Sequence, residues 1–142
     1  METNNGSSLP DIRQTAVFAA PIRKVWDAVA TSEGIAAWFM PNTFKAEPGV
    51  AFELDSGPYG KSYCKVTELD PPNRLSFAWG DDWTVTFELK ALDDGKTEFT
   101  LIHSGWKAGM TTAFGEKNEI VRERMNGGWV GLVGKLGKIV EG

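Results

Sequence analysis

Residues 83–90 read WTVTFELK, and this stretch decides the class of fold. Its aromatic and aliphatic side chains occupy every second position, alternating with threonine, glutamate and lysine. That period is typical of a β-strand with one face in a core and the other toward solvent, because successive side chains of a strand point to opposite faces. We therefore predict a half-buried strand here.

The same period of two recurs on both sides of this stretch, over residues 50–54, 61–69, 75–79 and 99–103. Turns recur about every ten residues, and no helical pattern separates one strand from the next. We therefore predict a meander of antiparallel strands, since parallel strands would need helical crossovers. The turn sequences are Gly57-Pro58-Tyr59-Gly60, Pro71-Pro72-Asn73, Gly80-Asp81 and Asp93-Asp94-Gly95-Lys96.

Helical spacing flanks the meander on its N-terminal side. A strand is predicted over residues 11–20, and Pro21 ends it at a position that suits the start of a helix. Apolar residues three and four apart over 22–29 predict a short amphipathic helix. A second short helix is predicted over 33–39, with an N-cap at Thr31-Ser32.

A long terminal helix is predicted from Asn118, its N-cap, to about Val140. Its length of about 33 Å is enough to cross a whole sheet. Five glycines within this range disfavour a helix, since each lowers helix stability by up to about 1 kcal/mol relative to alanine. We interpret Gly127 and Gly128, beside Trp129, as points where the helix backbone approaches the sheet closely. The preceding stretch, 105–117, fits helical spacing only in part. The apolar stripe of the helix comprises Val121, Met125, Trp129, Leu132, Val133 and Leu136.

Composition narrows the class of protein. A chain of 142 residues fits one domain, which we place at residues 11–142, after a polar and disordered N-terminal segment at residues 1–10. Net charge is −4 without a basic run, which argues against nucleic acid as a partner. No apolar run approaches the roughly 20 residues of a membrane span. With no signal peptide visible and a single cysteine, Cys64, we expect a cytoplasmic protein.

The order strand, two short helices, antiparallel meander and long terminal helix resembles the START-like superfamily, which includes polyketide cyclases and Bet v 1-like proteins. Within it the chain resembles the branch named for homologues of the Hsp90 ATPase activator. The resemblance implies an α+β helix-grip fold, in which a curved antiparallel sheet of about six or seven strands, two short helices and a long C-terminal helix enclose an apolar cavity. The segments that carry it are residues 20–26 (APIRKVW), 31–39 (TSEGIAAWF), 101–106 (LIHSGW) and 127–129 (GGW).

The resemblance also implies a function. Members of the superfamily bind varied lipids, polyketides and polyphenols, and some bacterial relatives in this branch bind flavonoid- or chalcone-like molecules. We therefore expect a small, mostly apolar, aromatic ligand in the cavity between sheet and C-terminal helix, and a link to stress responses. Binding is favoured over catalysis, but two alternatives stay open. One is a cyclase or aromatase using His103 as acid and base, and the other is a module that interacts with a chaperone. Because the eukaryotic co-chaperone carries this fold as one of two domains, we expect no Hsp90 activation by this chain alone.

Candidate site residues follow from the faces expected to meet the cavity. Aromatic residues make up 11% of the chain, including six tryptophans, and flat ligands stack well on such side chains. His103, the sole histidine, is either a polar anchor, an acid or base, or a hydrogen-bonded residue at the rim of the core. Neither a cofactor nor a metal is expected, and no catalytic residue is assigned. The candidate ligand-binding residues are Trp38, Phe39, Tyr63, Phe77, Trp79, Trp83, Val85, Phe87, Phe99, Leu101, His103, Trp106, Met125, Trp129 and Val133.

Overall fold

Six strands form one antiparallel sheet in the computed structural model, which describes residues 9–109, 111 and 115–142. The strand order is β1-β6-β5-β4-β3-β2, so the last five strands form the predicted meander and the first strand joins its far edge. With its helices, the sheet confirms the predicted α+β helix-grip fold. The strands are β1 (Ile12–Phe18), β2 (Ala51–Asp55), β3 (Lys61–Asp70), β4 (Arg74–Trp79), β5 (Trp83–Ala91) and β6 (Thr97–Ser104).

Strand β5 lies at the centre of the sheet and carries the alternation that predicted it. Phe87 pairs with Leu75 of β4 on one side and with Leu101 of β6 on the other. All three side chains are buried, so the inward-facing positions of neighbouring strands form a continuous apolar layer. The register therefore places the apolar faces of three strands together in one core.

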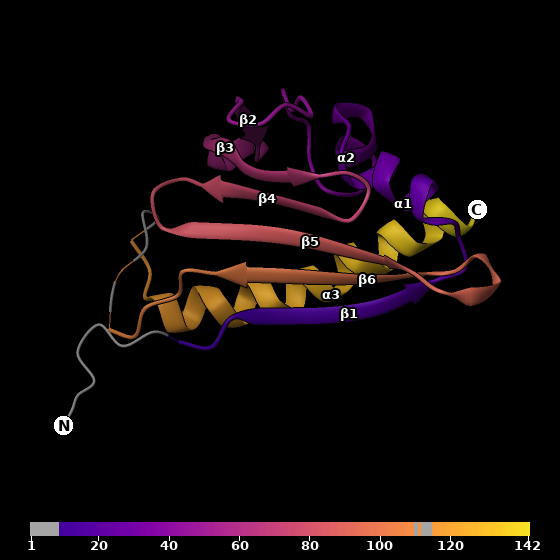
Figure 1. Cartoon of the computed structure of the whole chain (residues 1–142). Coiled ribbons are helices and arrows are strands. Elements are labelled where there is room, and N and C mark those ends of the chain that lie inside the picture. The colour runs from indigo at the N-terminus through magenta and orange to yellow at the C-terminus, as the bar shows by residue number, and fades with distance from the viewer. Residues whose placement is uncertain (1–8, 110, 112–114) are drawn as a thin grey trace.

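In the described part of the chain, three α-helices accompany the sheet: α1 (Ile22–Val29), α2 (Ser32–Trp38) and α3 (Asn118–Glu141). Figure 1 shows α3 lying along one face of the sheet, with α1 and α2 beside its C-terminal half. The side chain of Thr31 accepts a hydrogen bond of 3.0 Å from the backbone N–H of Gly34, which confirms the predicted cap. None of the described helices is long and apolar enough to cross a bilayer.

The start of α3 differs from the prediction. Asn118 is the first residue of the helix and Lys117 precedes it as the N-cap, so the prediction of Asn118 as the cap is wrong. The side chain of Asn118 instead accepts a hydrogen bond of 3.3 Å from the backbone N–H of Lys107. An asparagine side chain can satisfy a neighbouring loop as readily as a helix end, and here it ties the preceding loop to the helix.

The close approach between α3 and the sheet is also elsewhere than predicted. A Cβ atom added at Gly127 or Gly128 would meet nothing within 4 Å, so the interpretation of these glycines as close contacts is wrong. At Gly137, in contrast, the added Cβ would lie 3.0 Å from a ring carbon of Phe18. The helix therefore packs tightly at Gly137, where its C-terminal half passes the end of β1, and not at its centre.

The N-terminal segment predicted to be disordered falls mostly outside the described residues. Within them, the backbone N–H of Leu9 donates a hydrogen bond of 3.0 Å to the carbonyl of Trp106. The carbonyl of Pro10 accepts a hydrogen bond of 2.7 Å from the side chain of Arg122 on α3. These two contacts hold the chain just before β1 against the loop after β6 and the start of α3.

Candidate ligand-binding pocket

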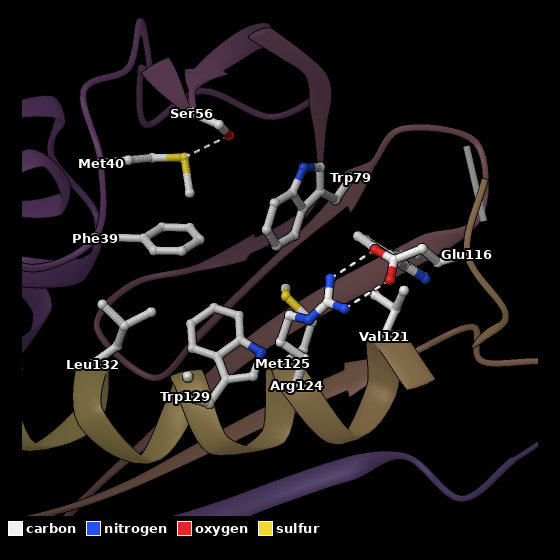
Figure 2. Close-up of a pocket in the computed structure, with 12 residues that line it drawn as sticks. Phe39, Met40, Ser56, Trp79, Glu116, Val121, Arg124, Met125, Trp129 and Leu132 are labelled. Atoms are coloured by element: carbon white, nitrogen blue, oxygen red, sulfur yellow. Dashed lines mark hydrogen bonds and ion pairs between the residues drawn. The ribbon is translucent and has the colours of Figure 1, made fainter. Parts of the chain in front are cut away.

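A pocket of about 530 Å³ lies between the sheet, the segment after α2 and helix α3 (Figure 2). Its volume is in the range of pockets that bind small organic molecules. Most of the lining side chains are aromatic or aliphatic. They are Phe39, Met40, Ser56, Trp79, Trp83, Glu116, Val121, Arg124, Met125, Gly128, Trp129 and Leu132.

Three kinds of local structure bring these side chains together. Trp79 ends β4 and Trp83 begins β5, and the two residues are paired across the turn that joins the strands. Phe39 follows the last residue of α2. Helix α3 contributes residues three and four apart, from Val121 to Leu132, which place one face of a helix toward the pocket.

Four aromatic rings form a continuous wall of the pocket. The ring of Phe39 lies 5.1 Å from Trp129 and 5.7 Å from Trp79, measured between ring centroids. Trp79 in turn contacts Trp83 edge to face at 5.4 Å. We call Phe39, Trp79, Trp83 and Trp129 the aromatic wall. Such a surface suits a flat aromatic ligand, because rings gain stability from offset or edge-to-face contacts beyond the area they bury.

His103 lies behind this wall and does not line the pocket. Its side chain is fully buried, and its Nδ1 accepts a hydrogen bond of 2.9 Å from the indole N–H of Trp129. Ring contacts with Trp79, Trp83 and Trp106 complete its surroundings, at centroid distances of 5.7, 5.0 and 4.7 Å. His103 therefore holds one ring of the aromatic wall in a fixed orientation.

Burial also sets the charge of His103. Removal from water lowers its pKa to about 3, because a charged imidazolium would be poorly solvated among the indoles. The ring is therefore neutral at physiological pH, and since Nδ1 accepts a hydrogen bond, Nε2 carries the proton. Nε2 finds no hydrogen-bond partner among the described residues, although Trp83 meets the ring nearly at a right angle. This arrangement suits a packed core histidine better than an acid or base.

Polar groups reach the pocket at two places (Figure 2). The hydroxyl of Ser56 donates to the sulfur of Met40 at 3.6 Å. Elsewhere on the rim, the Arg124 guanidinium donates two hydrogen bonds of 2.7 Å, one to each carboxylate oxygen of Glu116. The guanidinium stabilises the charged carboxylate and lowers the pKa of Glu116. No cluster of metal-binding side chains occurs among the residues described.

The predicted site residues divide into three groups. Five of them line the pocket: Phe39, Trp79, Trp83, Met125 and Trp129. Tyr63 lies on β3 and is 73% exposed, outside the pocket lining. The others are buried in the core without lining the pocket, and they are Trp38, Phe77, Val85, Phe87, Phe99, Leu101, His103, Trp106 and Val133.

Packing explains why the concave face is filled at those positions. Phe18 of β1 stacks on Phe99 at 5.6 Å, and Phe99 lies 5.7 Å from Phe87. Trp38 of α2 closes the other side of Phe87 at 5.7 Å, and its indole N–H donates to the carbonyl of Ala28. This half of the space between sheet and helices is therefore solid core, and the pocket occupies the other half.

Seven lining residues were not among the predicted site residues. Val121 and Leu132 belong to the apolar stripe of α3, so helical spacing alone could have suggested them. The others lie in loops or on the more polar side of α3, where no period marks them. The seven are Met40, Ser56, Glu116, Val121, Arg124, Gly128 and Leu132.

Solved structures share this fold. A solution structure of protein BH1534 from Bacillus halodurans is 49% identical, with a TM-score of 0.86, and the match covers 94% of this chain and 99% of that one. The Aha1 dimer of Colwellia psychrerythraea is 19% identical, with a TM-score of 0.76 and coverage of 94% and 97%. DynU16, from the dynemicin biosynthetic locus, is 24% identical with a TM-score of 0.74, covering 92% of this chain and 47% of that one. No curated protein matches the chain.

The sequence profile of one protein family covers most of the chain. It is described as activator of Hsp90 ATPase homolog 1-like protein, and it matches residues 19–141. The match takes in both short helices, the strands β2 to β6 and all of α3, and it includes every residue of the pocket lining given above. The chain belongs to this family of proteins like the activator of Hsp90 ATPase homolog 1.

Proposed function

We propose that this protein binds a small, mostly apolar, aromatic molecule, of flavonoid-, chalcone- or polyketide-like shape, in the pocket between sheet and α3. One observation carries the proposal: the aromatic wall borders a space of about 530 Å³ whose lining is mostly apolar. A space of that size holds a molecule of two or three rings, and its walls offer stacking and edge-to-face contacts.

The expected affinity is moderate. Burial of about 400 Å² of ligand surface at roughly 25 cal/mol/Å² contributes about 10 kcal/mol. Association costs at least about 4 kcal/mol in lost translational and rotational freedom. The difference corresponds to a dissociation constant of some tens of micromolar. Reversible binding in the pocket is therefore enough to account for the proposed function, without a catalytic step.

The placement of His103 favours binding over acid–base catalysis by that residue. A pKa of about 3 leaves the ring uncharged near neutral pH, and its Nδ1 is engaged by Trp129. A general base must reach the substrate proton directly or through one water molecule, and His103 is behind the aromatic wall. We therefore propose that His103 is a positioning residue for Trp129.

Relatives add weight to the proposal without naming the ligand. DynU16, which shares this fold, is a protein of the dynemicin biosynthetic locus.

The single cysteine, Cys64, is a buried free thiol, which is compatible with the proposed cytoplasmic location. The family description suggests a second candidate, interaction with an Hsp90-type chaperone. Stimulation of an Hsp90 ATPase at micromolar protein would support that candidate.

A titration with a neutral aromatic probe tests the proposal. Chalcone should quench tryptophan fluorescence saturably, with half-saturation at some tens of micromolar, because three tryptophans line the pocket. Phe39→Leu keeps apolar volume but removes one ring of the aromatic wall, and it should weaken binding about threefold to tenfold. Tyr63→Leu removes an exposed ring outside the pocket and should leave binding unchanged. Equal effects of both variants, or no saturable quenching, would contradict the proposal.

A further inference from the structure

Among the described residues, the Glu116–Arg124 pair is the only charged element in the lining of the pocket. Twelve described residues line it, and the other ten are uncharged. The side chains of Arg124 and Glu116 are 61% and 41% exposed, so both lie at the rim, with the apolar lining beside them. Figure 2 shows the two bonds between them on the side of the pocket where α3 begins. A ligand in the pocket would therefore have one charged neighbour group.

The geometry of the pair indicates what kind of group Arg124 is arranged to bind. Each carboxylate oxygen of Glu116 accepts one hydrogen bond of 2.7 Å from the guanidinium. This fork-to-fork arrangement is specific for planar groups with two acceptor oxygens, since the two parallel N–H bonds match their spacing. Arg124 thus presents a carboxylate-binding surface at the edge of an aromatic pocket.

Glu116 can leave this position at little cost. It precedes α3, which begins at Asn118, and its side chain is 41% exposed, so rotation about the side-chain bonds is enough to turn the carboxylate toward solvent. Ion pairs between exposed side chains contribute little to stability, because water solvates both partners when they separate. An incoming carboxylate would form the same two bonds with Arg124, while Glu116 turned into solvent. A carboxylate therefore neutralises the charge on Arg124 both before and after the exchange.

We infer that the ligand is an aromatic carboxylate, with its rings against the aromatic wall and its acid group on Arg124 in the place of Glu116. In this arrangement Glu116 is an internal surrogate for the acid of the ligand. The inference rests on the proposed function and adds the charge class of the ligand. It also assigns opposite roles to the two members of the pair, since Arg124 attracts the ligand and Glu116 competes with it.

Two probes of the same shape separate this inference from the proposed function. Biphenyl-4-carboxylate and biphenyl-4-carboxamide differ in charge but share both rings, and calorimetry gives their dissociation constants. Arg124→Gln should weaken the carboxylate about threefold to fivefold, the most that an ion pair between exposed groups contributes. Glu116→Gln should tighten the carboxylate about threefold by removing its competitor. The carboxamide should change less than about twofold in both variants.

The control for Glu116→Gln is Glu123→Gln. It makes the same change in net charge as Glu116→Gln, at an exposed residue of α3 outside the pocket lining. It should leave both dissociation constants unchanged, and thermal melting should show all variants folded. If Glu116→Gln weakens the carboxylate, or if Arg124→Gln affects both probes equally, the inference is overturned. If the wild type binds both probes and no variant changes either dissociation constant, the proposed function stands and the inference is overturned. If neither probe binds the wild type, both proposals fail.

Discussion

Two adjacent glycines of α3 allow the pocket to be blocked without disturbing the core. A Cβ atom at Gly127 or at Gly128 would meet nothing within 4 Å, and both positions are exposed. Only Gly128 lines the pocket. The Gly128→Leu side chain should therefore enter the space that we assign to the ligand, whereas the Gly127→Leu side chain should point into solvent. The two variants differ in that respect and share the same change in composition.

The expected magnitudes differ for stability and for binding. Each substitution replaces a helical glycine, which should stabilise the fold by up to about 1 kcal/mol. That gain corresponds to a rise in melting temperature of about 2–4 °C for a domain of this size. For Gly128→Leu, the new side chain should displace about 100 Å² of ligand contact, or about 2.5 kcal/mol. Chalcone should then bind about 60-fold more weakly to Gly128→Leu and as before to Gly127→Leu.

Thermal melting by circular dichroism and fluorescence titration on both variants check these values. If Gly128→Leu is stable and binds chalcone as the wild type does, the ligand lies elsewhere and the pocket assignment is refuted. If Gly128→Leu melts well below Gly127→Leu, the leucine meets packed atoms, and the space beside α3 is smaller than the structure indicates. Weaker binding by both variants alike would point to a general change in α3 and would also refute the argument.

Three further predictions concern stability. Since burial lowers the pKa of His103 to about 3 from an ordinary value of 6.5, the unfolded state binds the proton more readily, and stability should fall as pH drops from about 6.5 toward 3. Urea unfolding at pH 7 and pH 4.5 should show a smaller loss of stability for His103→Gln than for the wild type. An equal loss in both proteins would contradict the assignment of this pH dependence to His103. Gly137→Val should lower the free energy of unfolding by about 1–3 kcal/mol, because its Cβ meets the ring of Phe18. Gly134→Val, where a Cβ meets nothing within 4 Å, should lower it by less than about 1 kcal/mol. Equal melting temperatures of the two variants would contradict this prediction. Gly34→Ala should destabilise the fold by more than about 2 kcal/mol, because its Cβ would lie 2.3 Å from the backbone carbonyl oxygen of Asp27, and a variant that melts like the wild type would exclude that contact.

The strands could be predicted from the sequence because alternation reports burial locally. Every second residue of β5 from Trp83 to Leu89 is buried, as the stretch WTVTFELK indicates without any knowledge of its neighbours. The cap at Thr31 is equally local, since it depends on a hydroxyl three residues before an N–H. Features that depend on residues close together in the chain could therefore be predicted from the sequence.

The extent of the pocket could not be predicted in the same way. Leu101 and Trp83 both belong to strand faces that point toward α3, yet one is packed in the core and the other lines the pocket. The difference arises from segments far away in the chain, because Phe18 of β1 and Trp38 of α2 fill one half of the space. Loop residues such as Ser56 carry no period at all. The hollow part of the face is decided by long-range packing, which no local pattern encodes.

The pairing of β1 with β6 has a consequence for the order in which the molecule assembles. Ile12 lies opposite His103, so the first strand must wait for a partner about ninety residues later in the chain, whereas β2 to β6 pair as successive hairpins. Closing a long loop costs chain entropy before its contacts reward it, so local hairpins form sooner. During synthesis, α3 leaves the ribosome after every strand. The cavity therefore forms only after α3 has been synthesised, and a ligand can bind only chains that already contain this helix.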